Sequence, residues 1–307
     1  MKIVLATDGS GYARIAEEVL TKFEQAKTAE WHVVSVATPL PVAVASLDTA
    51  ADFAGADELS LAWHHIKAAT KETATQVASR LKERGFNATD HLLEGDPARA
   101  ILDYCTEIGA DLVALGSRGM GGFMSMLLGS VARRMVTHAP CSVLVSHPRE
   151  GSDPETHARE VGAKAKLDVV VAADGSDGAK FAMTKLGELG HYGKGIAVCV
   201  EPVSVIPPGL NPAEFGYAYR YDSERSEEVA QHGAEKLANI CDSVFHLVEL
   251  GRPAHVLVEQ AKKNGCDLIV LGATQHGFFE RFLLGSVSTE VANEADCSVL
   301  IVRVPKS

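Results

Sequence analysis

Long apolar runs are absent from this sequence of 307 residues, since none reaches the roughly 18 consecutive apolar residues that a membrane-spanning helix requires. Basic residues are in the minority: 29 Lys and Arg stand against 40 Asp and Glu, so the formal net charge is −11. Affinity for nucleic acids and for anionic lipids comes mainly from clustered Lys and Arg. We therefore expect a protein that binds neither nucleic acid nor membranes.

Cysteine motifs are missing as well, because no C-x-x-C spacing and no short disulfide framework occurs. The six cysteines are Cys105, Cys141, Cys199, Cys241, Cys266 and Cys297. Several lie in or beside apolar segments, where a cysteine behaves as a small apolar residue. We expect them to pack in a core within a reducing compartment. The first residues show no signal-peptide layout, so the expected location is the cytoplasm.

Apolar material for a core is plentiful, at 46% hydrophobic residues, and the length fits either two domains or one α/β barrel. An internal repeat decides between them. A shift of 156 residues aligns residues 95–145 with residues 251–301 without a gap, and 20 of the 51 positions are identical. Asp8-Gly9-Ser10 likewise recurs as Asp174-Gly175-Ser176. The chain is therefore expected to contain one structural unit twice.

The boundary between the two copies is expected in a polar stretch that holds two prolines and a glycine. We predict domains at residues 1–147 and 166–307, joined by a linker at residues 148–165. Two further long segments, residues 39–53 and 202–221, are expected to be irregular connections.

Within each copy, short β-branched runs alternate with segments of helical periodicity. The first copy is expected to have strands at residues 2–6, 31–36, 89–94, 112–115 and 142–145, and helices at residues 10–23, 59–84, 97–108 and 130–138. Apolar strands followed by helices imply a parallel sheet that is covered on both faces. We predict an α/β fold of two doubly wound, five-stranded parallel-sheet domains in tandem. The last strands of the copies are expected to pair, which would make an internal pseudo-dimer.

A glycine-rich segment follows the expected strand at residues 112–115, where ligands bind in such sheets. It reads Gly116-Ser117-Arg118-Gly119 and, ten residues later, Gly129-Ser130-Val131. Glycines permit positive φ and let backbone N–H groups approach an anion. Ser130 stands where the next helix begins, so unpaired N–H groups there offer a phosphate site, and Arg118 can add charge-assisted hydrogen bonds. A turn that only joins strand to helix is the simpler alternative.

The spacing Gly116-x2-Gly119-x9-Gly129-Ser130 matches the G-x2-G-x9-G-[S/T] signature of ATP-binding universal stress proteins, and the duplicated chain resembles a tandem member of that family. The resemblance implies ATP as ligand, held with Mg or Mn, an unidentified protein partner, and a dimeric or tandem assembly. It places the nucleotide at Ala6, Thr7, Asp8, Val36, Leu115, Gly116, Arg118, Gly119, Gly129, Ser130 and Val131. Asp8 is expected near the ribose or base, and Val36 at the adenine through its backbone.

The second copy departs from this signature, because Gln275 stands where the second motif glycine is expected. Its charge also differs. Residues 116–134 carry three arginines and no acid, whereas residues 272–290 carry one arginine and two glutamates. The retained residues are Asp174, Val200, Gly272, Gly285, Ser286 and Val287. We expect one good nucleotide site in the first copy and one degenerate site in the second.

Other candidate residues have simpler explanations. His64 and His65 point about 100° apart on a helix and do not converge on one metal ion, so we expect a solvated helix face. Asp8 and Asp174 each precede a helix, and the serine two residues later is the expected cap. Neither a G-x4-G-K-[S/T] phosphate loop nor a G-x-S-x-G nucleophile motif occurs in the sequence.

These features predict ATP binding for stress response or signalling, mainly in the first domain. No catalytic residue can be identified, because no general base is positioned for attack by water, and any hydrolysis is expected to be slow. Two alternatives stay open. One is an enzyme of slow ATP hydrolysis or nucleotidyl transfer, and the other is a chaperone-like interaction protein with a structural nucleotide.

Overall fold

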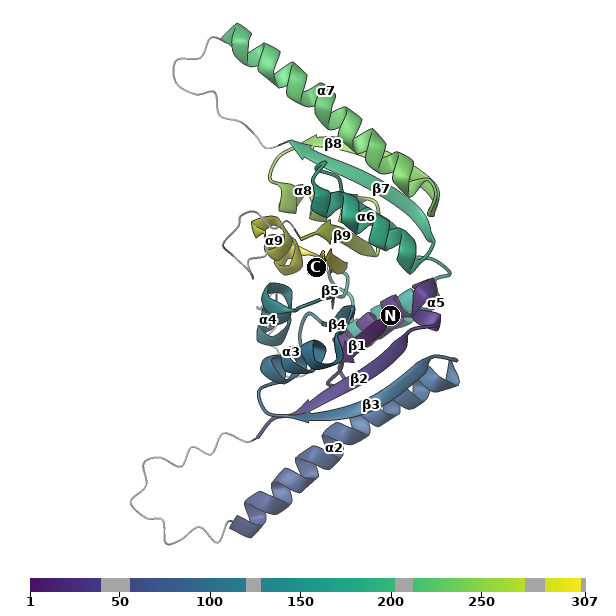
Figure 1. Ribbon diagram of the computed structural model, residues 1–307, viewed down its shortest axis with the longest axis vertical. Coiled ribbons are helices and arrows are strands. Elements are labelled where there is room, and N and C mark those ends of the chain that lie inside the picture. Colours follow the sequence, from purple (N-terminus) through teal and green to yellow (C-terminus); the bar gives the residue numbers. More distant parts are fainter. Residues whose placement is uncertain (40–55, 120–127, 202–211, 274–284, 305–307) are drawn as a thin grey trace, which may run out of the picture.

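The computed structural model describes residues 1–39, 56–119, 128–201, 212–273 and 285–304 (Figure 1). The first copy contains β1 (Lys2–Ala6), α1 (Gly11–Leu20), a short 3-10 helix η1 (Glu24–Lys27), β2 (Glu30–Ala37), α2 (Ala56–Glu83), β3 (Asn87–Glu94), α3 (Pro97–Ile108), β4 (Leu112–Gly116), α4 (Ser130–His138) and β5 (Ser142–Ser146). The second copy repeats this order after α5 (Pro154–Ala163), with β6 (Val169–Ala172), α6 (Asp177–Leu189), β7 (Tyr192–Glu201), α7 (Pro212–Leu237), β8 (Cys241–Leu250), α8 (Pro253–Lys263), β9 (Leu268–Gly272), α9 (Ser286–Glu294) and β10 (Ser298–Val302).

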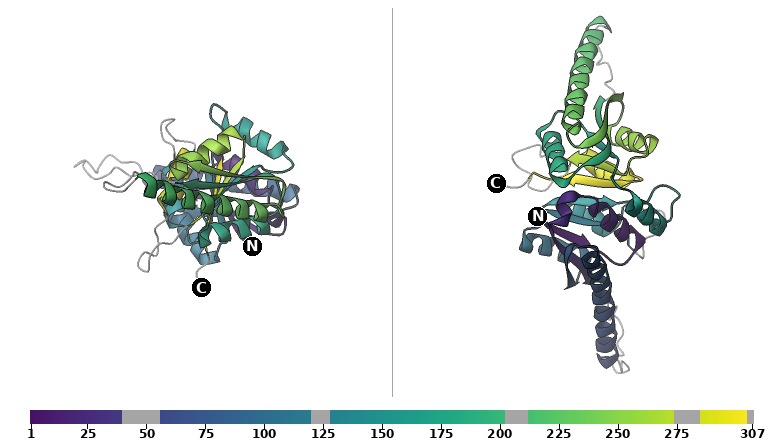
Figure 2. Two further views of the ribbon diagram at one scale, coloured as in Figure 1. Left: turned by 90° about the horizontal axis from the view of Figure 1, so that it is seen from above. Right: turned by 90° about the vertical axis from the view of Figure 1, so that its right-hand side faces the viewer.

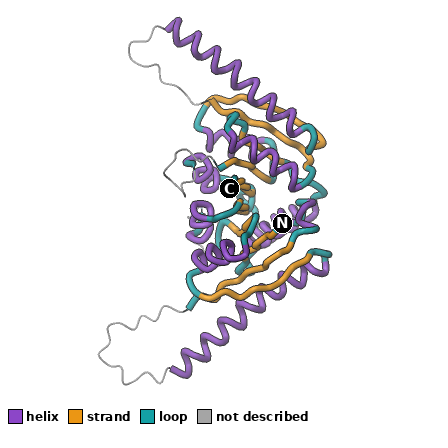
Figure 3. Tube along the Cα trace, viewed as in Figure 1, coloured by secondary structure: helices purple, strands orange, loops and turns teal. Residues whose placement is uncertain are grey.

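One ten-stranded sheet runs through both copies in the order β3-β2-β1-β4-β5-β10-β9-β6-β7-β8 (Figure 3). The strands within each copy are parallel, and the two halves meet where β5 and β10 pair antiparallel, with Leu144 opposite Leu300. The predicted α/β class, the two five-stranded parallel halves and the pairing of the last strands are confirmed. Figure 1 shows α2 and α7 at opposite ends of the molecule, each beside an edge strand.

Two apolar layers cover the sheet because successive strand residues point to opposite faces. Ile3 and Leu5 of β1 join a core with α1, α2, α5, α6 and α7, whereas Val4 joins a core with α3, α4, α8 and α9. Each core contains residues of both copies, whose ribbons meet at the centre of the molecule (Figure 2, right). The two copies are therefore held together by buried apolar surface as well as by strand pairing. All six cysteines are free and buried, as the sequence predicted.

Helix α3 shows why local sequence places these elements. The Asp96 side chain accepts a hydrogen bond from the backbone N–H of Arg99, and Pro97 occupies the first turn, where its missing N–H costs nothing. Gly109 ends the helix with a φ of 63°, a conformation that favours glycine. None of the helices in the described ranges is long and apolar enough to cross a membrane.

The expected linker contains a packed helix that the sequence analysis did not predict. Helix α5 lies against α1, where an added Cβ on Gly11 would come within 2.8 Å of Pro154. Lys22 of the first copy donates to the backbone oxygens of Gly162 and Lys164 at 2.6 Å. Lys164 in turn contacts both carboxylate oxygens of the buried Asp267 at 2.7 Å. The connection between the copies is therefore fixed to both of them.

The expectation of an irregular connection at residues 202–221 is wrong for its second half, because α7 begins at Pro212. A proline is well suited to the first turn of a helix, so a residue that suggested a loop here starts one. Residues 202–211, and residues 40–53 of the other expected connection, lie outside the described residues.

Candidate functional site

A cavity of about 700 Å³ lies in the first copy, beyond the carboxyl ends of β1, β2 and β4. All eleven residues that the sequence predicted for the first site line it. They come from the ends of β1, β2 and β4 and from the start of α4, which are separate stretches of the sequence. The doubly wound sheet brings these stretches together at one edge, which is where such folds bind ligands.

Asp8 is held in a tight turn at the edge of this cavity. Its Oδ1 accepts a hydrogen bond from the backbone N–H of Ser10 at 3.0 Å, and Gly9 between them has a φ of 81°. The Ser10 hydroxyl accepts a hydrogen bond from the backbone N–H of Ala13, which caps α1. Ser176 caps α6 in the same way in the second copy. The two predicted serine caps are confirmed.

The three motif glycines, all within the described residues, matter because other atoms lie close to them. They do not adopt unusual backbone angles. Glycine permits positive φ, but Gly116, Gly119 and Gly129 are not among the described glycines that adopt it, and φ is −68° at Gly129. A Cβ added to Gly116 would come within 2.6 Å of the Cβ of Tyr12 on α1. A Cβ on Gly119 would come within 2.6 Å of Oδ2 of Asp8. The first glycine therefore lets α1 pack against β4, and the second makes room for the Asp8 carboxylate.

Hydrogen-bond donors gather at the start of α4. Gly129 precedes this helix and supplies no side-chain cap, so the first backbone N–H groups have no side-chain acceptor. Among the described residues, the Oγ atom of Ser117 has no hydrogen-bond partner, although Ser117 is only 1% exposed. The Nε atom of Arg118 is also buried and has no partner in the described ranges. Buried polar groups in proteins nearly always have a partner, so this part of the wall suits an anionic ligand.

Arg118 is placed by Tyr12, a residue of α1 that the sequence analysis did not select. The guanidinium lies 5.8 Å from the centre of the Tyr12 ring, and it donates to the Tyr12 hydroxyl at 3.4 Å. Burial, together with the positive charge of Arg118, lowers the pKa of His147 to about 4. The imidazole of His147 is therefore neutral near pH 7, and Arg118 carries the positive charge at this end of the cavity.

The charge difference that the sequence suggested between the two motifs is partly cancelled by ion pairs. Arg134 on α4 contacts the Asp96 carboxylate at 2.8 Å. In the second copy, Glu290 on α9 contacts Arg252 at 3.1 Å, so the same pair of positions has its charges exchanged. Neither Arg134 nor Glu290 therefore acts as an unpaired charge, and Arg118 is the motif arginine that lines the cavity.

Several residues of the cavity wall were not predicted from the sequence. Ser117 lies inside the glycine motif, and its position just after β4 could have pointed to it. Ile101 of α3 adds apolar surface, and Thr70 and Thr73 of α2 close the opposite side. No local signal identifies the two threonines, because their place depends on how a helix of 28 residues returns along the sheet.

The six residues expected at the second site repeat the backbone positions of the first. Gly272 ends β9, Val200 lies in β7, and Asp174 accepts a hydrogen bond from the backbone N–H of Ser176 at 2.9 Å. The other three lie at the start of α9, where Gly285 precedes the first helical residues Ser286 and Val287. Gln275 lies outside the described residues. A cavity of about 350 Å³ in the second copy is lined by none of the six, because it lies between α6 and α7.

His64 and His65 of α2 are the histidine pair that stands out in the sequence. His64 and His65 are both exposed, as the sequence predicted. Within the described parts of the chain, no group of three or more His, Cys, Asp or Glu side chains could hold a metal ion. Asp8 is the one carboxylate among the described residues that line the first cavity.

Comparison with known proteins identifies similar chains over both copies. The sequence model described as the universal stress protein family matches residues 1–147 and 168–303. A universal stress protein of Mycobacterium tuberculosis is 28% identical over 318 aligned residues, which cover 99% of this chain and 95% of that protein. One from Mycolicibacterium smegmatis is 29% identical over 248 residues, or 78% of this chain and 76% of that protein. The crystal structure of a universal stress protein from Archaeoglobus fulgidus has a TM-score of 0.60 at 20% identity, covers 98% of each chain and shows the same fold.

Proposed function

Because the chain belongs to the universal stress protein family, we propose that its first copy binds ATP and that the bound nucleotide sets the state of the protein in stress response or signalling. One observation carries the proposal. The eleven residues at which the family resemblance places the nucleotide come from distant parts of the sequence, and all of them line one cavity of about 700 Å³. That volume lies well within the range of small-molecule sites.

The walls of the cavity divide into parts that match the parts of a nucleotide. Apolar side chains, among them Val36 and Ile101, offer a surface for a flat base. Phosphates fit the start of α4, where unpaired backbone N–H groups, the Ser117 hydroxyl and Arg118 converge. Asp8 provides one carboxylate, and a Mg or Mn ion that entered with ATP would take most of its ligands from phosphates and water.

Binding is favoured over rapid turnover by the residues that surround the cavity. Among the described lining residues, Asp8 is the sole acid, and there is neither histidine nor lysine. Asp8 is already engaged in the turn that positions Ser10, so none of the described lining side chains stands ready to activate water. Any hydrolysis in this site would be slow, and a single-turnover assay with labelled ATP measures it directly.

The place of action forms the remaining part of the proposal. Six free, buried cysteines suit a reducing compartment, so we assign the protein to the cytoplasm. A nucleotide-dependent module needs a protein partner that distinguishes its two states, and a pull-down with and without ATP would detect it.

A matched pair of substitutions tests the proposed site. Ser130 and Ser286 are both the first residue of a helix that follows glycine, one in each copy. A glutamate at the first turn of a helix is favourable for stability, but it places a negative charge where phosphates would bind. We expect Ser130→Glu to weaken ATP binding about a hundred-fold in a calorimetric titration, and Ser286→Glu to leave it nearly unchanged. Equal effects of both substitutions, or an effect of Ser286→Glu alone, would contradict the assignment to the first copy.

A further inference from the structure

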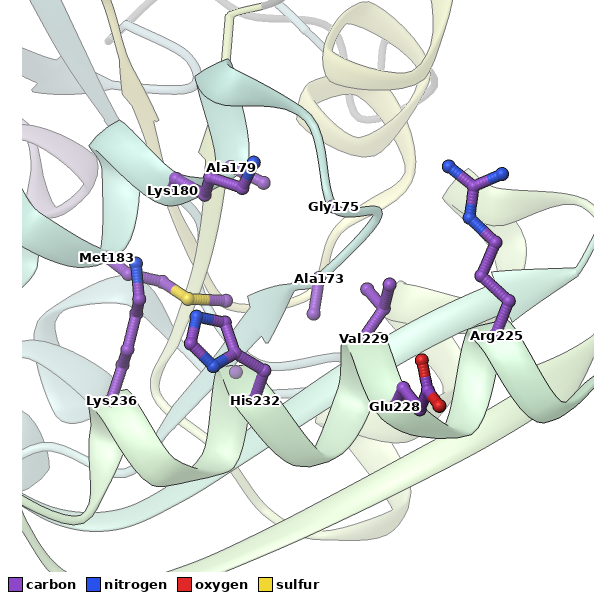
Figure 4. Close-up of a pocket in the computed structure, with 11 residues that line it drawn as sticks. Ala173, Gly175, Ala179, Lys180, Met183, Arg225, Glu228, Val229, His232 and Lys236 are labelled. Atoms are coloured by element: carbon purple, nitrogen blue, oxygen red, sulfur yellow. The ribbon is translucent and has the colours of Figure 1, made fainter.

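The cavity between α6 and α7 is lined by none of the six residues expected at the second nucleotide site. Its volume is about 350 Å³, near the lower end of the range of ligand sites. Figure 4 shows Lys180 and Met183 reaching in from α6, while His232 and Lys236 rise from α7 toward Met183. Arg225 lines the other end of the cavity. The cavity thus combines apolar surface with several positive groups.

Its charge is unlike that of the surrounding protein. The lining contains three cations, Lys180, Arg225 and Lys236, and one carboxylate, Glu228. Counting Lys, Arg and Glu, the lining therefore carries two net positive charges, within a chain whose net charge is −11. An anion is the ligand that this distribution attracts.

The first copy shows which residues occupy the corresponding place there. Helices α2 and α7 align at a shift of 156 residues, because Thr73 and Val229 make the same contact with the turns at Gly9 and Gly175. The turns and the helices after them, α1 and α6, align at a shift of 166 residues. Lys236 then corresponds to Arg80.

In the first copy, a buried ion pair closes this crevice. Glu17 of α1 is 1% exposed, and its two carboxylate oxygens accept hydrogen bonds from Arg80 at 2.9 and 2.5 Å. Val77, three residues before Arg80 on α2, is buried and only 6% exposed. Carboxylate and cation compensate each other, as buried charges must.

The second copy keeps the cation and has lost the carboxylate. Met183 occupies the position of Glu17, and Gly233 occupies that of Val77. The carboxylate that closes the crevice in the first copy is thus missing here, and a smaller residue lies beside it. In the described part of the chain, the ammonium group of Lys236 has no hydrogen bond or ion pair.

We propose that this cavity binds a small organic acid with an apolar tail. Its carboxylate would lie beside Lys236, as that of Glu17 lies beside Arg80, and its tail would contact Met183, Ala179 and Val229. Lys180, which pairs at 3.5 Å with the fully exposed carboxylate of Asp177, would add to the attraction. The site is separate from the nucleotide cavity, so it would give the second copy a ligand of its own.

Titration of the full chain with sodium hexanoate tests the proposal, and hexanamide serves as the uncharged control of the same shape. The site is followed by calorimetry and by NMR signals of the methionine methyl groups. We expect hexanoate to bind at least about tenfold more tightly than hexanamide, because only the acid can pair with Lys236. We also expect the Met183 methyl signal to shift.

Three variants locate the binding. Lys236→Met removes the charge and keeps the length of the side chain, so it should weaken hexanoate binding about tenfold or more. Met183→Glu introduces a carboxylate at the position of Glu17 and should abolish hexanoate binding. A thermal melting curve of this variant serves to check that it is folded. Lys185→Met, on α6 but outside the cavity lining, is the control that should bind as the unmodified protein does.

The proposal is overturned if hexanoate does not bind, or if the acid and the amide bind equally. It is also overturned if Lys236→Met binds hexanoate as tightly as Lys185→Met does. None of these outcomes depends on ATP, so failure here leaves the proposed nucleotide site untouched.

Discussion

The two copies share a backbone and differ in where they place charge. Each has a five-stranded parallel sheet, a serine-capped first helix and a helix that begins after a glycine in the nucleotide motif. In the first copy the crevice between the first two helices is closed by a buried ion pair, and a large cavity lies at the strand ends. In the second copy that crevice is open and positively charged. Duplication thus kept the apolar layers and let the polar groups diverge.

The largest expected contrast concerns the ion pair that only the first copy has. Arg80→Met leaves the buried Glu17 with the more distant Arg84, 3.7 Å away, as its remaining cation. We expect the free energy of unfolding to fall by about 3 kcal/mol, the typical cost of breaking a buried pair. Lys236→Met, at the matching position of the second copy, removes no ion pair and should change it by less than about 0.5 kcal/mol. Urea unfolding of both variants measures the difference, and equal losses would show that the copies do not differ here.

A second contrast concerns the residue that follows the last strand of each copy and contacts a helix of the other copy. His147, just after β5, lies against the backbone of Ala292 in α9, and Arg303, just after β10, donates to the backbone oxygens of Val136 and Thr137 in α4. These contacts are related by the internal repeat. Cations are favourable at the last turn of a helix, and Arg303 supplies one at neutral pH, whereas His147 does not.

This difference predicts that the free energy of unfolding depends on pH through His147 and not through Arg303. The pKa of His147 is lowered by burial to about 4, below its ordinary value of about 6.5. The unfolded chain therefore takes up a proton first, so stability is complete above pH 6.5 and falls as the pH drops toward 4. From pH 7 to pH 5, we expect His147 to account for a loss of about 2 kcal/mol.

The measurement is the free energy of unfolding of the unmodified protein and of His147→Gln at pH 7 and pH 5. Burial also lowers the pKa values of His32 and His157, so the variant should keep part of the slope and lose the part that belongs to His147. An identical slope in both proteins would mean that His147 is not buried as described.

The smallest expected effect is one in which the copies agree. Ser10→Ala and Ser176→Ala each remove the side chain that caps the first helix of a copy. Each should cost about 1 kcal/mol of unfolding free energy, which is typical of a lost serine cap. Thermal or urea unfolding would check this, and a cost in only one copy would show that the two turns are not equivalent.

Repetition made most of the fold predictable from the sequence. The segment Cys141-Ser142-Val143-Leu144 recurs as Cys297-Ser298-Val299-Leu300, and both copies of it form the central strands that pair. Helix α5 was not predicted from the sequence, because tertiary contacts and not a local pattern stabilise it. Its apolar side is short, and it becomes stable by packing Ala158 and Val161 onto the core.

The first cavity was predictable as far as its motif extends along the chain. Asp8 and Gly119 lie at strand ends, where the fold class alone places ligands. Thr70 and Thr73 reach the cavity from a long helix, and the cavity between α6 and α7 depends on Met183 standing where the first copy has Glu17. Such cavities form between side chains from distant parts of the chain. No local sequence pattern predicts them.

The central claim is that the two copies differ in nucleotide binding, and the number of ATP molecules bound per chain tests it most directly. Equilibrium dialysis with labelled ATP should give one molecule per chain. Gly119→Gln, which copies the residue of the second motif and brings a Cβ within 2.6 Å of the Asp8 carboxylate, should remove it. Two equal sites that both survive this substitution would contradict the account.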